Sequence, residues 1–291
     1  GDWSSDVCSS DLLFQSMSIP ESTEECVFRI LREQCDIHTI LSQEYLKYWS
    51  DYYLTNDWNK LDRPSITENW NGSYFKYPPH VEIARKLDYW KENESIPSFS
   101  GSVVGYGDME CPCSFMNEVN DAAVSILRDP EITWEQAIHN VIRLLGEHGL
   151  QHLLGMRHTV GSSWILYPSR DFLLNLFEKK HNPKAQLTVG ARALSKHSIR
   201  CKGAWGEMRG PECVQNEIAR STLLRIMEHC IWINIHLLPH DIVALEIRIE
   251  DGFGARWDLT NSMFRGFVEP YMENGYAVHW IHNDQDRKSV V

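Results

Sequence analysis

The sequence predicts an α+β fold, in which a mainly helical N-terminal region packs on a C-terminal antiparallel β-sheet. Apolar residues at helical spacing follow several capping signals in the N-terminal part. Residues Val243–Glu250 instead alternate between apolar and polar side chains, as in a strand with one buried face. We expect one domain over residues 17–285, with residues 94–114 as the place where an internal boundary would fall and residues 211–270 as a sheet module.

Both ends of the chain look foreign to this domain. Residues 1–12 and 286–291 resemble translated sequencing-adapter read-through and show no hydrophobic period. We therefore expect both tails to lack contacts with the core.

Capping signals place the helices of the N-terminal region. Ser22 and Thr133 each stand three residues before a Glu or Gln, which is a capping box. Pro79 fits the first turn of a helix, because its missing N–H has no partner there in any case. Gly149 is expected to end the helix that begins after Thr133, and Leu187–His197 is expected to be helical.

One amphipathic helix and four strands make up the sheet module. The helix is expected at Glu212–His229, and the first strand, Ile231–Leu238, ends before a proline. The remaining strands are expected at Val243–Glu250, Ala255–Leu259 and Phe264–Glu269.

The faces of the strands fix the length of the hairpin loop. A three-residue loop at Asp251–Phe253 sets Arg248 opposite Arg256 and Ile247 opposite Trp257. A two-residue loop would place apolar residues opposite charged ones, because side chains alternate with period two. An odd-length loop is therefore expected.

Charged residues gather on one face of these strands. All three cations are arginines, which suit bidentate binding of phosphate or carboxylate better than lysine does. Carboxylates beside such arginines can hold Mg²⁺ or act as acid–base groups. The alternative is a solvated face whose charges pair across strands. The residues are Glu246, Arg248, Arg256, Asp258, Arg265 and Glu269.

Two further groups are candidates for the same site. His240 and Asp241 stand next to each other before the second strand, where an aspartate can orient a histidine as a general base. A basic stripe on the predicted helix before the module can bind an anionic ligand. The stripe contains Arg192, Lys196, His197 and Arg200.

The formal charge of −12 argues against a nucleic-acid partner, because such proteins need a basic surface. No apolar run reaches the roughly 20 residues of a membrane helix, so we expect no membrane partner and a cytoplasmic location. The scattered cysteines are expected to be reduced, and the Cys111–Cys113 spacing does not complete a zinc site. No metal ligand is therefore predicted.

Two functions of different classes remain open. The first is an enzyme or small-molecule binder that holds an anionic ligand on the Arg/Glu face. The second is a protein-interaction module that uses the aromatic-rich helical surface. The segment LEIRIEDGFG at residues 245–254 also resembles the Glu-x-Arg strand of carboxylate–amine ligases. That resemblance implies an ATP-dependent reaction on an antiparallel sheet with acidic metal ligands.

Overall fold

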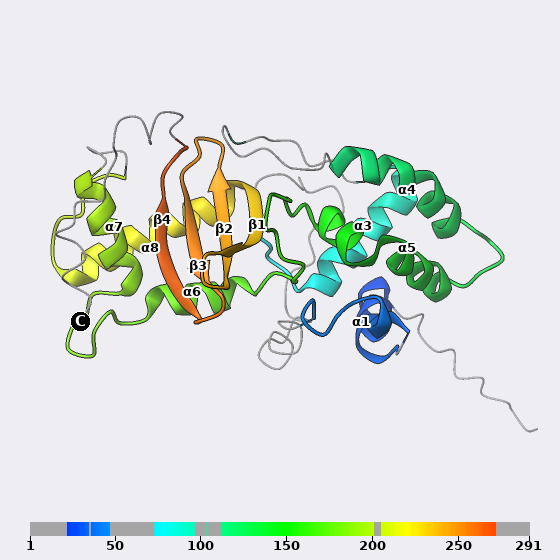
Figure 1. The fold of residues 1–291 in the computed structure, drawn as a ribbon, viewed down its shortest axis with the longest axis horizontal. Coiled ribbons are helices and arrows are strands. Elements are labelled where there is room, and N and C mark those ends of the chain that lie inside the picture. Colours follow the sequence, from blue (N-terminus) through cyan, green and yellow to red (C-terminus); the bar gives the residue numbers. More distant parts are fainter. Residues whose placement is uncertain are drawn as a thin grey trace, which may run out of the picture.

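The computed structural model describes residues 22–34, 36–46, 73–96, 103, 112–200 and 205–271. The predicted foreign tails and most of residues 94–114 lie outside this part of the chain. The predicted α+β class is confirmed. Helices occupy one end of an elongated molecule, and the sheet with its own helices occupies the other (Figure 1).

The described part of the N-terminal region is mainly helical. Its helices contact one another and form one end of the molecule (Figure 1). They are α1 (Thr23–Glu33), the 3-10 helix η1 (Ile37–Thr39), α3 (Pro79–Asn93), α4 (Pro112–Leu127) and α5 (Trp134–Leu154).

The capping predictions for this region are confirmed at the helix starts. Ser22 and Thr133 each close a full capping box, and Pro79 opens α3. The predicted helix end at Gly149 is wrong by three residues, because the helical backbone breaks at Gly146 with a φ of 58°, and a second helical stretch then continues α5 to Leu154. Gly155 ends it in the left-handed region, with a φ of 82° that glycine adopts without steric cost.

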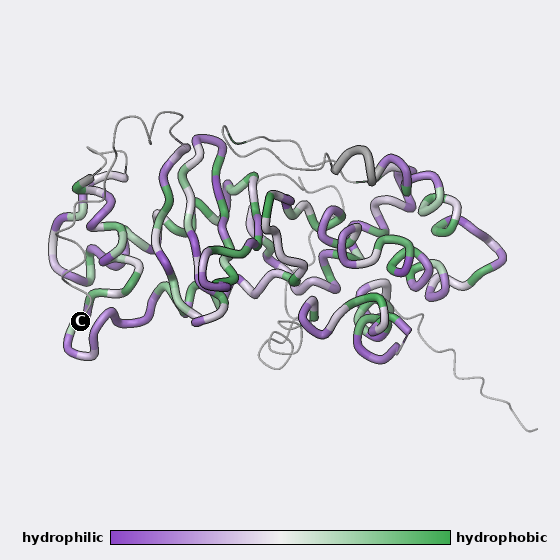
Figure 2. The backbone as a smooth tube through the Cα atoms, in the orientation of Figure 1, coloured by the Kyte–Doolittle hydropathy of each residue, from purple (hydrophilic) through white to green (hydrophobic). Residues whose placement is uncertain are grey.

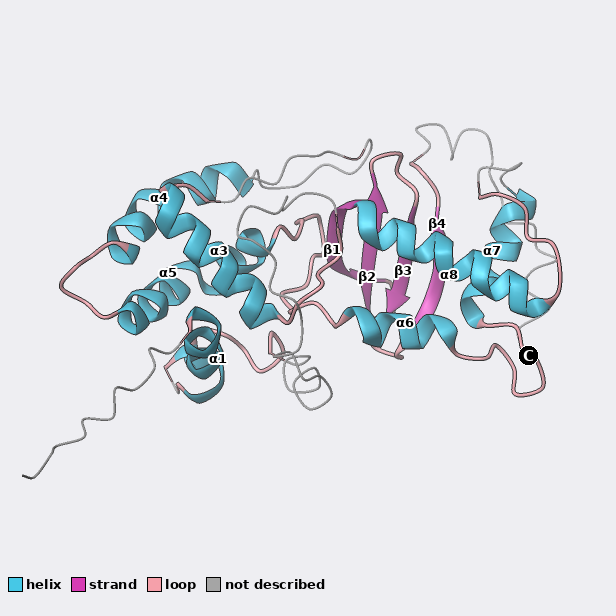
Figure 3. Ribbon diagram, turned by 180° about the vertical axis from the view of Figure 1, so that it is seen from behind, coloured by secondary structure: helices cyan, strands magenta, loops and turns pink. Residues whose placement is uncertain are grey.

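The C-terminal region is a four-stranded antiparallel sheet with three helices. The sheet order is β1-β2-β3-β4, a simple meander. Helices α6 and α8 cross one face of the sheet, and α7 lies beyond β4 (Figure 3). The elements are α6 (Arg170–Glu178), α7 (Val189–Arg200), α8 (Glu212–His229), β1 (Cys230–Leu238), β2 (Ile242–Ile249), β3 (Gly254–Asp258) and β4 (Met263–Val268).

The β2–β3 hairpin has the predicted faces but a different register. Glu246 pairs with Arg256, and Leu245 pairs with Trp257, so the predicted Arg248–Arg256 pairing is wrong by two residues. The turn begins one residue earlier in the chain than predicted, because the Ile249 amide donates to the Phe253 carbonyl oxygen at 2.9 Å. This register sets a carboxylate, instead of a second cation, opposite Arg256.

A bulge in β4 changes the direction of the residues after it. Arg256 pairs with Gly266 while Trp257 pairs with Phe264, which leaves Arg265 as the extra residue. An extra residue shifts the alternation of side chains along a strand. The predicted placement of Glu269 on the same face as Glu246 is therefore wrong.

Residues 157–163, which we call the edge segment, join the helical region to the sheet. The amides of Arg157 and Ser163 donate to β1 carbonyl oxygens at 2.8 and 2.7 Å, and the Leu237 amide donates to the Gly161 oxygen at 2.8 Å. These bonds occupy the outer edge of β1. An edge strand that would otherwise present unpaired backbone groups is thus covered.

Apolar residues from both regions form one buried core. It includes Ile30 and Leu87 of the helical region and Leu223 and Trp257 of the sheet region. Hydrophobic and hydrophilic residues both occur along each strand, as an amphipathic sheet requires (Figure 2). Within the described residues, no helix is long and apolar enough to cross a membrane.

Candidate functional site

The sheet has a polar face opposite the one that α6 and α8 cover. A cross-strand row on this face runs from Asn234 through Glu246 and Arg256 to Gly266. A second row contains Trp232, Arg248, Gly254 and Val268. The third row contains His236, Ala244, Asp258 and Met263.

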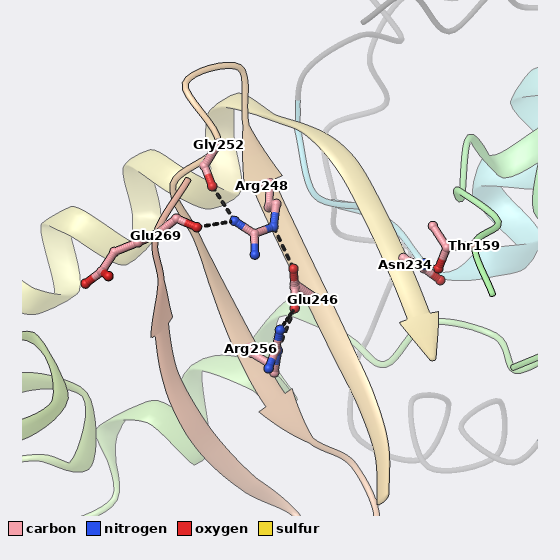
Figure 4. Close-up of polar contacts among 7 residues, drawn as sticks. All are labelled: Thr159, Asn234, Glu246, Arg248, Gly252, Arg256 and Glu269. Carbon is pink, nitrogen blue, oxygen red and sulfur yellow. Dashed lines mark hydrogen bonds and ion pairs between the residues drawn. The ribbon is translucent and has the colours of Figure 1, made fainter. Parts of the chain in front are cut away.

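Glu246 lies at the centre of the polar face and bridges two arginines (Figure 4). Its Oε1 accepts from Arg248 Nε at 2.6 Å, and its Oε2 accepts from Arg256 Nε at 2.5 Å. The Glu246 side chain is only 1% exposed. A buried carboxylate between two guanidiniums is not a solvated surface pair, so the alternative of a solvated charged face does not hold at this position.

Arg248 acts within the fold and does not face solvent. Its side chain is 2% exposed, and its Nη1 donates to the Gly252 carbonyl oxygen and, at 2.8 Å, to the Glu269 carbonyl oxygen. With the Glu246 bond, these contacts tie β2 to the hairpin turn and to the end of β4. These contacts hold the Arg248 side chain inside the fold, between Glu246 and the two backbone oxygens.

Two other arginines remain accessible on this face. The Arg256 side chain is 27% exposed while Glu246 holds one edge of its guanidinium. Arg265 projects from the β4 bulge, and its Nη1 lies 3.9 Å from Asp258 Oδ2. Asp258 is buried and is itself held by the backbone and side chain of Asn261. Arg256 and Arg265 are therefore the partly exposed arginines of this face.

His197 and Glu269 form a separate pair beside β4. His197 Nδ1 lies 2.8 Å from Glu269 Oε1, and the two side chains are 18% and 21% exposed. Figure 4 shows the Glu269 carboxylate pointing away from Glu246, while its carbonyl oxygen faces Arg248. The structure thus joins two predicted site residues, but outside the polar face.

The remaining predicted residues do not join the polar face. His240 and Asp241 lie in the exposed β1–β2 turn, both with positive φ, beyond the start of β2 and so more than about 13 Å along the chain from Glu246 at the rise of an antiparallel strand. Arg192 and Lys196 lie on α7 at intermediate exposure. Arg200 is the last residue of that helix.

Sequence reasoning missed two polar residues of β1. Asn234 is fully buried; its Nδ2 donates to Thr159 Oγ1 at 2.7 Å, and its Oδ1 accepts from Ser162 Oγ at 2.8 Å. His236 lies two residues further along the same face. The two residues are two positions apart in β1, so the alternation of strand side chains places them on the same face. The strand is otherwise apolar and β-branched, however, which favours the interpretation that it belongs to the core.

A group of histidines lies near the end of α5. His158 stacks near Trp164 and His152, and burial lowers the pKa of His152 to about 4 and that of His158 to about 3. Over the described ranges, no three His, Cys, Asp or Glu side chains are grouped so that they could hold a metal ion.

Comparisons with known proteins concern the C-terminal region. Residues 177–269 match the family model described as the CdiA C-terminal tRNase toxin domain. A solved structure of the toxic C-terminal tip of CdiA from Pseudomonas aeruginosa, in complex with an immune protein, is 30% identical, with a TM-score of 0.28. That match covers 32% of this chain and 99% of the toxin chain. A search of curated proteins found no match.

These matches overturn the predicted function. The best prediction, a small-molecule anion binder, is wrong, because the matching family is a nuclease toxin domain. The resemblance to carboxylate–amine ligases rested on ten residues within the same region. A short alternating strand beside a glycine-containing turn arises in many unrelated sheets, so it carried no specific information.

The exclusion of a nucleic-acid partner was also unfounded, because the excess of acidic over basic residues lies outside residues 177–269. Residues 177–269 contain 13 lysines and arginines against 11 aspartates and glutamates, a formal charge of +2. The other 198 residues contain 15 against 29, a charge of −14. Within this chain, residues 177–269 are therefore the part that is similar to the CdiA C-terminal tRNase toxin domain family.

Proposed function

We propose that residues 177–269 form a ribonuclease domain that cleaves tRNA. The observation that carries this proposal is the family match, whose range contains α7, α8, the whole sheet and every charged residue of its polar face. This function would also account for the buried charge cluster at Glu246, because a nuclease needs cations held in place to bind a phosphodiester.

Arg256 is the residue best placed to bind the phosphate at the cleavage point. Glu246 holds its Nε edge, which fixes the plane of the guanidinium before any ligand arrives. A guanidinium that is oriented in advance loses little conformational entropy on binding. Arg265, which is 43% exposed, supplies a second cation from the adjacent strand.

A basic stretch beside the sheet supports binding of the RNA backbone. Residues 179–202 contain seven lysines and arginines and no aspartate or glutamate. Of these, residues 179–200 form the connection from α6 to α7, and α7 itself. Neutralising RNA phosphates with such a stretch releases counterions and supplies affinity that does not depend on sequence.

We also propose a protein partner for this region. The related toxin tip was solved in complex with an immune protein. Co-purification of this chain with a binding protein that abolishes its RNA cleavage would support this part of the proposal, and cleavage unaffected by every bound protein would count against it.

The test of the proposed function is cleavage of tRNA by the purified chain. Arg256→Lys keeps the charge but loses the fork geometry, and one charge-assisted hydrogen bond contributes about 1.5–3 kcal/mol. We expect cleavage to fall roughly 10- to 150-fold, with the melting temperature nearly unchanged.

Arg220→Lys is the matched control for this substitution. Arg220 is 52% exposed and pairs with Glu178 on the helical side of the sheet, so its replacement should leave cleavage unchanged. Wild-type protein that cleaves no tRNA in a purified pool would refute the proposal. Equal cleavage by both variants would remove Arg256 from the site.

A further inference from the structure

His236 occupies a distinctive position on the polar face of the sheet. It lies on β1 opposite Ala244, whose small side chain is followed across the sheet by Asp258. The Nδ1 atom of His236 is buried and has no hydrogen-bond partner in the described part of the chain. A buried ring nitrogen without a partner costs free energy, so its retention calls for an explanation.

The edge segment fixes the backbone on both sides of this histidine. The Ser163 amide donates to the oxygen of Ile235, and the Leu237 amide donates to the oxygen of Gly161. Ser162 forms a bridge to His236 itself. The backbone around His236 is therefore held by residues outside the family match, which begins at residue 177.

Charged groups from two strands face this ring. Glu246 and Arg248 project from β2, and Arg256 and Asp258 project from β3, on the same face. The neighbouring edge segment adds the titratable residues Arg157 and His158. Burial lowers the pKa of His236; the two arginines act in the same direction, and Glu246 acts against them. The imidazole is therefore neutral, and able to accept a proton, at neutral pH.

We propose that His236 is a catalytic base of RNA cleavage in this domain. This inference rests on the proposed ribonuclease function and adds the group that moves the proton. His236 and Glu246 are diagonal neighbours on adjacent strands, and Arg256 lies on the next strand. A phosphodiester held by Arg256 would thus lie on the same face of the sheet as His236.

The reaction step balances without a further reactant. His236 takes the proton of the ribose 2′-hydroxyl, and the 2′ oxygen attacks the adjacent phosphorus. An O2′–P bond forms and the P–O5′ bond breaks, which leaves a 2′,3′-cyclic phosphate and a 5′ oxygen that takes a proton from water. The imidazolium then releases its proton to the hydroxide that remains.

The experiment compares His236→Gln with His240→Gln on tRNA. His240 lies in the exposed turn four residues away and serves as the matched control. We expect His236→Gln to lower kcat about 100-fold or more, as loss of a general base does, while RNA affinity and melting temperature stay near those of wild type. His240→Gln should behave as wild type.

The pH profile separates a catalytic role from a structural one. A base must be deprotonated, so wild-type activity should hold above the lowered pKa of His236 and fall as the pH drops through it. In His236→Gln, this fall in activity at low pH should be absent. Wild-type protein should not cleave a substrate that carries 2′-deoxyribose at the cleaved position. The products that it forms from normal tRNA should carry 5′-hydroxyl ends.

Failure of the inference about His236 can be distinguished from failure of the proposed ribonuclease function. If wild type cleaves tRNA and His236→Gln retains its rate and its fall in activity at low pH, the inference about His236 is wrong and the ribonuclease function stands. If wild type cleaves no tRNA, the proposed function fails first, and the role of His236 as its base falls with it.

Discussion

At the scale of single residues, the polar face depends on one buried carboxylate. Glu246 accepts from Arg248 and Arg256 at once, with both of its oxygens engaged. Arg248 in turn is buried and bonded to two backbone oxygens. Removing the carboxylate would leave a buried guanidinium without its counter-charge, which costs more than the lost pair itself stabilises.

The first prediction concerns this carboxylate. Glu246→Gln should lower the free energy of unfolding by about 3–5 kcal/mol, the range found when one partner of a buried ion pair is removed. Urea denaturation measures the change. Glu250→Gln, at the exposed hairpin turn, is the control and should cost almost nothing. A loss below about 1 kcal/mol for Glu246→Gln would show that Arg248 finds another counter-charge.

At the scale of helices and strands, the sequence predicts local structure well where a short sequence pattern is enough to determine it. The capping boxes at Ser22 and Thr133 and the helix Glu212–His229 agree with the structure. Alternation likewise identifies the strands and the polar face around Glu246 and Arg256. Each of these features depends on residues only a few positions apart.

Features that depend on distant contacts could not be predicted. The bulge at Arg265 turns Glu269 away from the polar face toward His197, and no local residue signals it. The edge segment is equally hard to predict, because its backbone hydrogen bonds join residues far apart in the chain, from Arg157 to Ile233 and from Ser163 to Ile235. Its residues follow a helix and have no strand period of their own.

The second prediction tests the edge segment as a structural element. Ser163→Pro removes the amide that donates to Ile235 and leaves that carbonyl oxygen unpaired. We expect a loss of roughly 1–3 kcal/mol and faster hydrogen exchange at the Leu237 amide. Val160→Ala, in the same segment at 80% exposure, is the control. Unchanged exchange at Leu237 in Ser163→Pro would mean that the edge is held by other contacts.

At the scale of the whole molecule, charge is divided between the two ends. The family-matched region is weakly basic and the rest of the chain is strongly acidic, as the counts above show. A polyanion such as tRNA would therefore be repelled by the helical region and attracted to the sheet region. The net charge of the whole chain does not show this division, which is why the prediction of no nucleic-acid partner was unfounded.

The third prediction measures this division through salt dependence. The double variant Lys180→Gln with Lys184→Gln removes two exposed cations of the basic stretch. The slope of log affinity for tRNA against log salt should become shallower by about 2, roughly 1 per phosphate contact. Arg128→Gln with Arg143→Gln removes two exposed cations of the helical region and should leave the slope unchanged. Equal slopes for both double variants would place the RNA elsewhere.

The edge segment also bears on where this domain can be cut. The family match begins at residue 177, after the edge segment has ended. A fragment trimmed to that boundary would present the outer edge of β1 to solvent, with Ile233 and Ile235 carbonyl oxygens bare. Bare strand edges recruit other strands, so such a fragment would tend to self-associate into dimers or aggregates. We therefore expect a fragment that begins before Arg157 to self-associate less than one that begins at residue 177, which size-exclusion chromatography of the two fragments would measure.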